Sequence, residues 1–294
     1  MRFSNLPLWL LAGILWLVIQ LPYAIQLKIG GFFGWLAFHF SKRERRIAEI
    51  NIQKCFPQLD LLARKTLIKN SFISAGQGMI ETLFGFWGSP KRLKKLAHIQ
   101  NLHILQNALK QKKGVIVFGP HLSSVHFVGR LLNLVQPVGG MYFPPKNAFL
   151  RNITERALSH CFEFTVKRHE IRSFVKAMKN NKTILYTPDI DAGKEGLFVP
   201  FFNIPASTVT ATSRFAEMTD CIVIPGYYCR RKDNTGIDII FHEPLDNFPS
   251  GDVYADTLRI NQWLEKVISE HPEQFIWQYK RFKSRPVGEK SFYA

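Results

Sequence analysis

The sequence of 294 residues predicts an α/β fold, a layered sheet flanked by helices, with a transmembrane or interfacial helix at the amino terminus. Three observations predict it. Short apolar runs alternate with helical patterns through the middle of the chain, as in domains built around a parallel sheet. Hydrophobic residues make up 46% of the chain, which is enough for one large core. A long apolar run occupies the amino-terminal part.

The apolar run covers residues 6–25, and Gln20 is its one strongly polar side chain. At about 1.5 Å per residue, a helix of this length crosses a hydrocarbon core of roughly 30 Å. We therefore expect residues 1–27 to be a membrane anchor and residues 28–294 to be a catalytic domain. A cleaved signal peptide is the alternative, but no A-x-A-like site follows the run. The basic residues on its carboxyl side place the catalytic domain in the cytoplasm: Lys28, Lys42, Arg43, Arg45 and Arg46.

The segment after the run carries an apolar stripe at helical spacing. The stripe consists of Ile29, Phe32, Phe33, Leu36 and Phe40. A basic cluster at residues 42–46 follows the last residue of the stripe. The pattern predicts a helix that lies in the membrane interface, and it fits a core-facing helix equally well.

The elements of the α/β domain follow in alternation. Strands are predicted over residues 114–118, 138–143, 183–187, 221–229 and 237–241. Helices are predicted between them over residues 124–135, 147–162, 171–180 and 208–218. A last helix is expected over residues 253–269, before His271 and Pro272. This order favours a layered domain with a largely parallel sheet.

The net charge of +17 indicates a polyanionic partner, which could be nucleic acid, anionic lipid or an acidic carrier protein. No recognised nucleic-acid-binding motif accompanies the charge, so we expect a membrane and no nucleic acid. Four cysteines stand without C-x-x-C or zinc-finger spacing. Neither a disulfide framework nor a zinc site is therefore expected.

The run of residues 119–126 offers an imidazole, His121, where a predicted strand meets a helix. Ser123 or Ser124 is expected to cap that helix, which would place His121 near its positive end. A positive end lowers the pKa of an imidazole and keeps it neutral, as a general base requires. A hydrogen-bonded structural histidine is the alternative.

A second group of polar residues follows the strand predicted over residues 183–187. Asp189 and Asp191 could share a site with His121, because the carboxyl ends of parallel strands line one crevice. A solvated, turn-capping pair is the other interpretation. Two acids without further oxygen ligands are weak support for a metal, and none is expected. The aromatic run at residues 198–202 suits either an alkyl slot or the core.

Separated motifs over nearly the whole chain keep the order and spacing of a known family. They are Leu21-Pro22-Tyr23, residues 51–57, Tyr142 with Pro144, Asn147 and Arg156, residues 188–194 and 199–202, and residues 277–286. Together they resemble the late acyltransferases of lipid A biosynthesis, a branch of the lysophospholipid acyltransferase superfamily. The resemblance implies a lysophospholipid acyltransferase-like fold at the cytoplasmic face of the inner membrane.

It also implies transfer of an acyl group from an acyl carrier protein thioester to a hydroxyl of a lipid A precursor, without a cofactor. In this family a His-x4-Glu or His-x4-Asp motif supplies the base, which would be His121 here. The carboxylate of that motif orients the ring and stabilises the imidazolium, as in a serine protease. The matching motifs further imply that Arg156, Asp191 and Lys194 bind substrate.

The sequence departs from the family pattern at His126, which occupies the position of the carboxylate. A neutral imidazole does not compensate a charged His121 as an anion would. Phe143 and Leu158 also stand where the family commonly has arginine. Three explanations follow: an active enzyme in which Asp189 or Asp191 supplies the charge, a catalytically degenerate homologue that binds lipid or carrier protein, or an acyltransferase for another membrane lipid.

Overall fold

A computed structural model describes residues 6–167 and 170–293 of the chain. A mixed sheet of seven strands forms its centre, in the order β1-β9-β8-β2-β5-β3-β4. The strands are β1 (Ala97–Gln100), β2 (Val115–Phe118), β3 (Gly139–Tyr142), β4 (Phe164–Lys167), β5 (Thr183–Tyr186), β8 (Ile222–Arg230) and β9 (Ile237–Phe241). All neighbours pair in parallel except β8 and β9. The predicted α/β class and its largely parallel sheet are confirmed.

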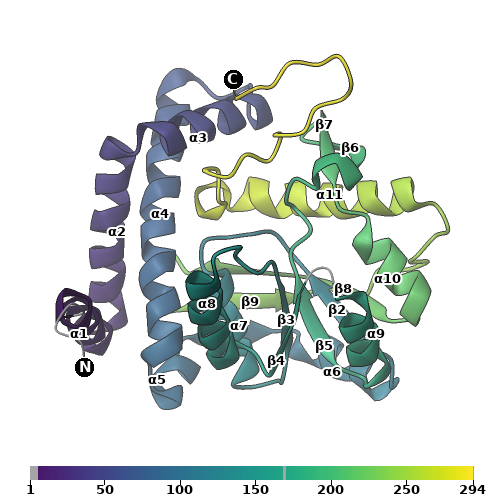
Figure 1. The fold of residues 1–294 in the computed structure, drawn as a ribbon, viewed down its shortest axis with the longest axis horizontal. Helices are drawn as coiled ribbons and strands as arrows, with labels where there is room; N and C mark the ends of the chain where they lie inside the picture. Colours follow the sequence, from purple (N-terminus) through teal and green to yellow (C-terminus); the bar gives the residue numbers. More distant parts are fainter. Residues whose placement is uncertain (1–5, 168–169, 294) are drawn as a thin grey trace.

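Helices cover both faces of the sheet (Figure 1). On one face lie α7 (Val125–Asn133) and α8 (Ala148–Cys161). On the other lie α9 (Ile171–Lys179), α10 (Ala211–Thr219) and α11 (Val253–Glu270). The connections between these parallel strands are right-handed crossovers. The chain moves from β2 toward β4 through α7 and α8, and it returns from β4 toward β8 through α9 and α10. The two pairs of helices therefore lie on opposite faces of the sheet.

The five predicted strands and five predicted helices of this domain are all present, with small shifts at their ends. Several elements were not predicted. These are β1, β4, the helices α3 (Lys42–Cys55), α4 (Leu61–Trp87), α5 (Pro90–Lys94) and α6 (Leu102–Lys110), and a hairpin of β6 (Leu197–Phe201) and β7 (Ile204–Thr208). The aromatic run at residues 198–202 lies in this hairpin, where Phe201 is fully buried and belongs to the core.

The predicted continuous helix over residues 6–25 is wrong. Helix α1 (Leu6–Gln20) ends before Leu21, and α2 (Tyr23–Phe40) begins after Pro22. Proline has no N–H to continue the helical ladder and disfavours helical backbone in the preceding residue. The expected boundary between residues 27 and 28 falls inside α2. Within residues 6–167 and 170–293, we find no helix with both the length and the apolar character needed to cross a membrane.

Helix α2 packs lengthwise on the long helix α4 (Figure 1). The two backbones approach so closely that a Cβ added at Gly34 would lie 2.2 Å from the Phe72 carbonyl oxygen. The glycines Gly30 and Gly34 of α2 therefore face α4, whereas the aromatic residues Phe32, Phe33, Trp35 and Phe40 are exposed. Phe32 and Phe33 are both 56% exposed, which rules out the core-facing interpretation of the stripe.

Candidate active site

His121 and Asp189 meet at the carboxyl ends of two neighbouring parallel strands. His121 is the third residue after β2, and Asp189 is the third residue after β5. The two strands pair in register, with Phe118 opposite Tyr186, so both side chains leave the sheet at the same level. The main-chain N–H of His121 donates to Asp189 Oδ2 at 2.7 Å, and His121 Nδ1 contacts Asp189 Oδ1.

The environment shifts the pKa values of both groups. Burial alone lowers the pKa of His121, but the adjacent Asp189 carboxylate reverses this and raises it above the usual value. Burial alone raises the pKa of Asp189, which is only 2% exposed, but the hydrogen bonds and charge of His121 lower it below the usual value. The expectation that a helix terminus depresses the pKa of His121 is therefore wrong. The nearby carboxylate has the stronger effect.

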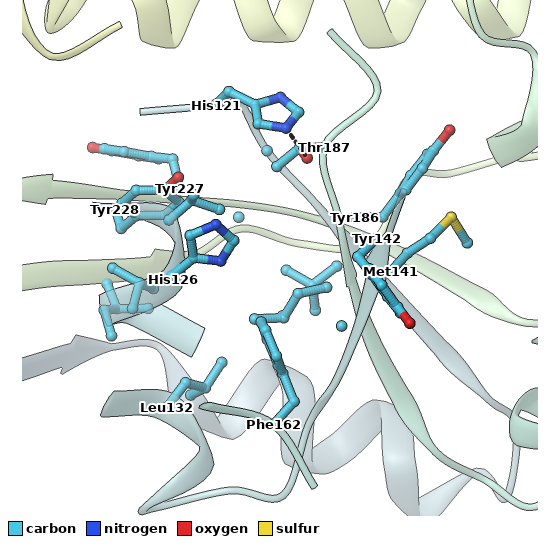
Figure 2. Close-up of a pocket in the computed structure, with 18 of the residues that line it drawn as sticks. His121, His126, Leu132, Met141, Tyr142, Phe162, Tyr186, Thr187, Tyr227 and Tyr228 are labelled. Carbon is cyan, nitrogen blue, oxygen red and sulfur yellow. Dashed lines mark hydrogen bonds between the residues drawn. The ribbon is translucent and has the colours of Figure 1, made fainter. Parts of the chain in front are cut away.

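The second nitrogen of the ring faces a hydroxyl. Thr187 Oγ1 lies 2.8 Å from His121 Nε2. Figure 2 marks this hydrogen bond with a dashed line. Since Nδ1 faces an ionised carboxylate, Nδ1 carries the proton of the neutral ring and Nε2 carries the lone pair. Nε2 is thus the basic nitrogen, and Thr187 donates to it.

An apolar pocket with a volume of about 150 Å³ opens beside this group (Figure 2). It lies between the sheet and helices α7 and α8. Its lining includes Val117, Val128, Leu132, Leu158, Phe162 and Leu185, together with His121, His126 and Thr187. The residues of the pocket are mostly hydrophobic, and His121 and Thr187 lie toward one end of it (Figure 2), which suits a ligand with an alkyl body and a reactive polar end.

His126 stands in the first turn of α7 and lines the pocket. Desolvation by the surrounding protein, and secondly the neighbouring His121, lower the pKa of the His126 imidazole. The residue as a whole is nevertheless exposed to solvent. A neutral His126 does not repel a protonated His121. The carboxylate that contacts His121 is Asp189, as one explanation of the departure from the family pattern required.

The three predicted substrate-binding residues, Arg156, Asp191 and Lys194, lie outside the pocket lining. Asp191 accepts hydrogen bonds from the Ser284 main chain and hydroxyl, both at 2.9 Å, and from the Gly193 N–H at 3.0 Å. Its carboxylate therefore ties the carboxyl-terminal segment to the turn. Arg156 on α8 and Lys194 after β5 are both exposed. Leu158, by contrast, is buried in the pocket wall.

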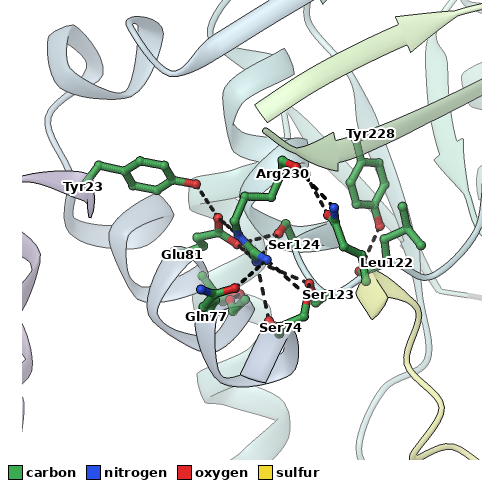
Figure 3. A network of polar contacts seen from close by, with 12 residues as sticks. Tyr23, Ser74, Gln77, Glu81, Leu122, Ser123, Ser124, Tyr228 and Arg230 are labelled. Atoms are coloured by element: carbon green, nitrogen blue, oxygen red, sulfur yellow. Dashed lines mark hydrogen bonds and ion pairs between the residues drawn. The ribbon is translucent and has the colours of Figure 1, made fainter. Parts of the chain in front are cut away.

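A buried ion pair that the sequence analysis missed supports the loop between the two histidines (Figure 3). Arg230, at the end of β8, donates to both oxygens of Glu81 on α4, at 2.9 and 2.7 Å. Ser124 also donates to Glu81, so its hydroxyl does not cap α7 as expected. Tyr23, at the start of α2, is a further donor to Glu81.

The face of α4 that carries Glu81 also packs directly against the loop between His121 and His126. Ser74 Oγ lies 2.9 Å from Ser123 Oγ. A Cβ at Gly78 would lie 2.1 Å from the Ser123 carbonyl oxygen, so only glycine fits there. From the sheet side, the Tyr228 hydroxyl donates to the Leu122 carbonyl at 3.1 Å. The one sequence signal for this support is the spacing of Ser74, Gly78 and Glu81 on one helix face.

Comparison with known proteins yields consistent matches over nearly the whole chain. The family profile described as "Bacterial lipid A biosynthesis acyltransferase" matches residues 3–284. The lipid A biosynthesis palmitoleoyltransferase of Escherichia coli (strain K12) is 31% identical over 287 residues, which cover 97% of this chain and 94% of the relative. The lauroyltransferase of the same organism is 30% identical with the same coverage. A lipid A biosynthesis acyltransferase of Haemophilus influenzae is 32% identical over 95% of this chain and 90% of the relative.

Proposed function

The chain belongs to the bacterial lipid A biosynthesis acyltransferase family and transfers acyl chains to a lipid A precursor, and from this premise we propose that His121 is the general base of the transfer. His121 Nε2 takes the proton of the acceptor hydroxyl as its oxygen attacks the acyl carbonyl. The Asp189 carboxylate stabilises the imidazolium that forms. The contact of His121 with a buried carboxylate is the observation that supports this proposal.

The donor in this proposal is an acyl carrier protein thioester. Its acyl chain lies in the apolar pocket, and its carbonyl carbon lies at the polar end beside His121. The leaving thiolate takes the proton from His121. Acyl carrier protein is acidic and the acceptor carries phosphates, so the chain's charge of +17 favours both.

His126 has a separate role in the proposal. A neutral imidazole at the pocket opening donates a hydrogen bond to the oxygen of the acyl carbonyl as negative charge develops on it. Arg156 and Lys194, two exposed cations, bind phosphate groups of the acceptor. No such role is assigned to Asp191, since its carboxylate already accepts hydrogen bonds from Ser284 and Gly193.

We further propose that the protein acts at the cytoplasmic face of the inner membrane, with α1 and α2 in the interface. The exposed apolar side chains of these helices support this, as does the basic start of α3 directly after them. They are Ile14, Trp16 and Leu17 on α1, and Phe32, Phe33, Trp35 and Phe40 on α2. Residues 1–27 then contribute to anchoring together with the remainder of α2.

Purified wild type, His121→Ala and His103→Ala test the base assignment. His103 is an exposed histidine on α6 and serves as the matched control. With acyl carrier protein thioester and lipid A precursor, wild type and His103→Ala should form the acylated product, and His121→Ala should form none while remaining folded. Full activity of His121→Ala would overturn the assignment. An inactive wild type would instead support a degenerate, binding homologue.

Vesicle flotation tests the membrane surface. Anionic vesicles should bind wild type and Met218→Ser, which removes an exposed apolar side chain on α10. The double variant Phe32→Ser, Phe33→Ser should bind less, because burying each of these rings contributes about 1.5–3 kcal/mol at most. Equal flotation of all three proteins would contradict the interfacial placement.

A further inference from the structure

The end of the apolar pocket that lies away from His121 is formed by buried side chains. Figure 2 shows His121 and Thr187 toward one end of the pocket, and Leu132 and Phe162 toward the other. Leu132 is 1% exposed and Phe162 is 8% exposed, so this end leads into the core and not to solvent. An acyl chain with its carbonyl carbon beside His121 therefore extends toward the Phe162 ring.

The Phe162 ring fills a slot between two glycines. A Cβ at Gly129 on α7 would lie 2.5 Å from Cζ of the ring and 2.6 Å from Cε1. A Cβ at Gly140 on β3 would lie 2.7 Å from Cε2, on the opposite edge of the ring. Carbon atoms pack at about 3.5–4.0 Å, so an alanine at either position would displace the ring.

The ring separates the pocket from the side of this slot that Gly129 forms. Among the residues that the structure describes, Gly140 belongs to the pocket lining and Gly129 does not. The Phe162 N–H donates to the Leu158 carbonyl at 3.0 Å, and the N–H of the following residue donates to the Val138 carbonyl at 2.9 Å. The main chain is thus held in place, and the size of the side chain at position 162 decides how deep the pocket is.

We propose that Phe162 limits the length of the acyl chain that the pocket binds, and thereby the length of the chain that the enzyme transfers. This inference rests on the proposed function, which places the acyl chain in this pocket. A chain that ends at the ring is bound over its whole length. Each further methylene group has to displace the ring or remain outside the pocket. With a smaller side chain at position 162, the slot beside Gly129 would receive the end of a longer chain.

The test measures kcat/KM with lipid A precursor and a series of acyl carrier protein thioesters, from octanoyl to palmitoyl. Phe162→Ala should move the optimum to longer donors, with about a fourfold gain for each methylene group that enters the slot. Phe162→Leu should move it in the same direction by less, and it keeps the test valid if the larger cavity of Phe162→Ala prevents folding. Gly129→Ala should move the optimum to shorter donors, because its methyl group pushes the ring toward the pocket. Phe127→Leu is the control and should keep the wild-type optimum, since this buried ring on α7 lies outside the described pocket lining.

A second measurement does not depend on turnover. Acyl carrier protein that bears an alkyl chain through a thioether cannot transfer it, and calorimetry gives its affinity for each variant as a function of chain length. The preferred length should move as it does for kcat/KM. An unchanged preference in Phe162→Leu and Gly129→Ala, or a shift in the same direction in both, overturns the inference. Acyl transfer by wild type with such an unchanged preference leaves the proposed function intact. Shifts of affinity in the two expected directions without any acyl transfer would support the role of Phe162 in binding and remove the proposed function.

Discussion

The Asp189→Asn substitution removes one of the two acceptors that this side chain offers to His121. One oxygen of Asp189 accepts the main-chain N–H of His121, and the other contacts Nδ1. Asparagine has a single acceptor oxygen, and the main-chain donor cannot change its role. The amide oxygen therefore faces the main chain, and the amide NH₂ group faces Nδ1. A donor at Nδ1 drives the ring proton to Nε2, where the base needs its lone pair.

The expected loss of acyl-transfer rate in Asp189→Asn follows from this change of tautomer. In serine hydrolases the same substitution lowers kcat about 10⁴-fold for the same reason. At about 1.36 kcal/mol for each factor of ten, the loss of transition-state stabilisation is roughly 5.4 kcal/mol. We expect a loss of about this size in the single-turnover rate of acyl transfer, with little change in the affinity for the donor.

The substitution should also move the pH profile. Asp189 raises the pKa of His121 against the lowering effect of burial, so its loss lowers that pKa. A general base works unprotonated, and activity rises as pH increases through its pKa. The rising limb of the profile for Asp189→Asn should therefore lie at lower pH than the limb for wild type.

The contribution of His121 to the free energy of unfolding falls as pH rises, whereas its activity as a base increases. Its folded pKa is raised, so the stabilisation that its protonation provides is complete below the unfolded value of about 6.5 and is lost as pH rises through the folded value. The stability difference between wild type and Asp189→Asn, measured by denaturant unfolding, should therefore shrink from slightly acidic to alkaline pH.

The matched control is Asp191→Asn, two residues away. Its carboxylate binds Ser284 and Gly193 and does not contact His121. This variant should unfold more easily and keep the wild-type pH profile. The reasoning is refuted if Asp189→Asn retains its rate within about tenfold, or if Asp191→Asn loses as much activity.

Three further outcomes are expected. His126→Glu should raise the pKa of His121 and shift the pH profile upward without increasing the limiting rate, because His121 already has a carboxylate partner; a tenfold or greater gain in that rate would contradict this. Glu81→Gln should lower the free energy of unfolding by about 3–5 kcal/mol, since it leaves a buried guanidinium without its counter-charge, whereas Tyr23→Phe should lower it by about 1 kcal/mol. Equal losses in urea unfolding would show that the ion pair is not the main contributor. Leu132→Phe should reduce kcat/KM more for long acyl donors than for short ones, because the added ring narrows the pocket; a uniform reduction would place the acyl chain elsewhere.

The sequence predicted the sheet where its strands are buried and apolar. The runs ending at Phe118 and Tyr186 are largely apolar, and they led to the prediction that Asp189 or Asp191 shares a site with His121, through the rule that parallel strand ends meet. Strand β1 was missed, because its four residues Ala97–Gln100 are too few for their alternation of apolar and polar side chains to stand out from the helical patterns on either side.

Helix α4 was missed for a different reason. Glycines such as Gly76 and Gly78 weaken a helical pattern, yet here they allow the close approach of α2 and of the loop before α7. The Glu81–Arg230 pair joins residues 149 positions apart, and no local pattern predicts such a contact. Thr187 was predicted as the last residue of the strand over residues 183–187, and its contact with Nε2 depends on the register of two strands.

That register constrains the lengths of the two loops. His121 and Asp189 each stand three residues beyond paired strand ends. One added residue in either loop would displace its side chain along the strand direction by about 3.3 Å, more than a hydrogen bond can bridge. Homologous chains can therefore vary the residue types around these positions far more freely than the number of residues. An insertion or deletion between strand β2 and His121, or between strand β5 and Asp189, is a direct indication that this pair has been lost.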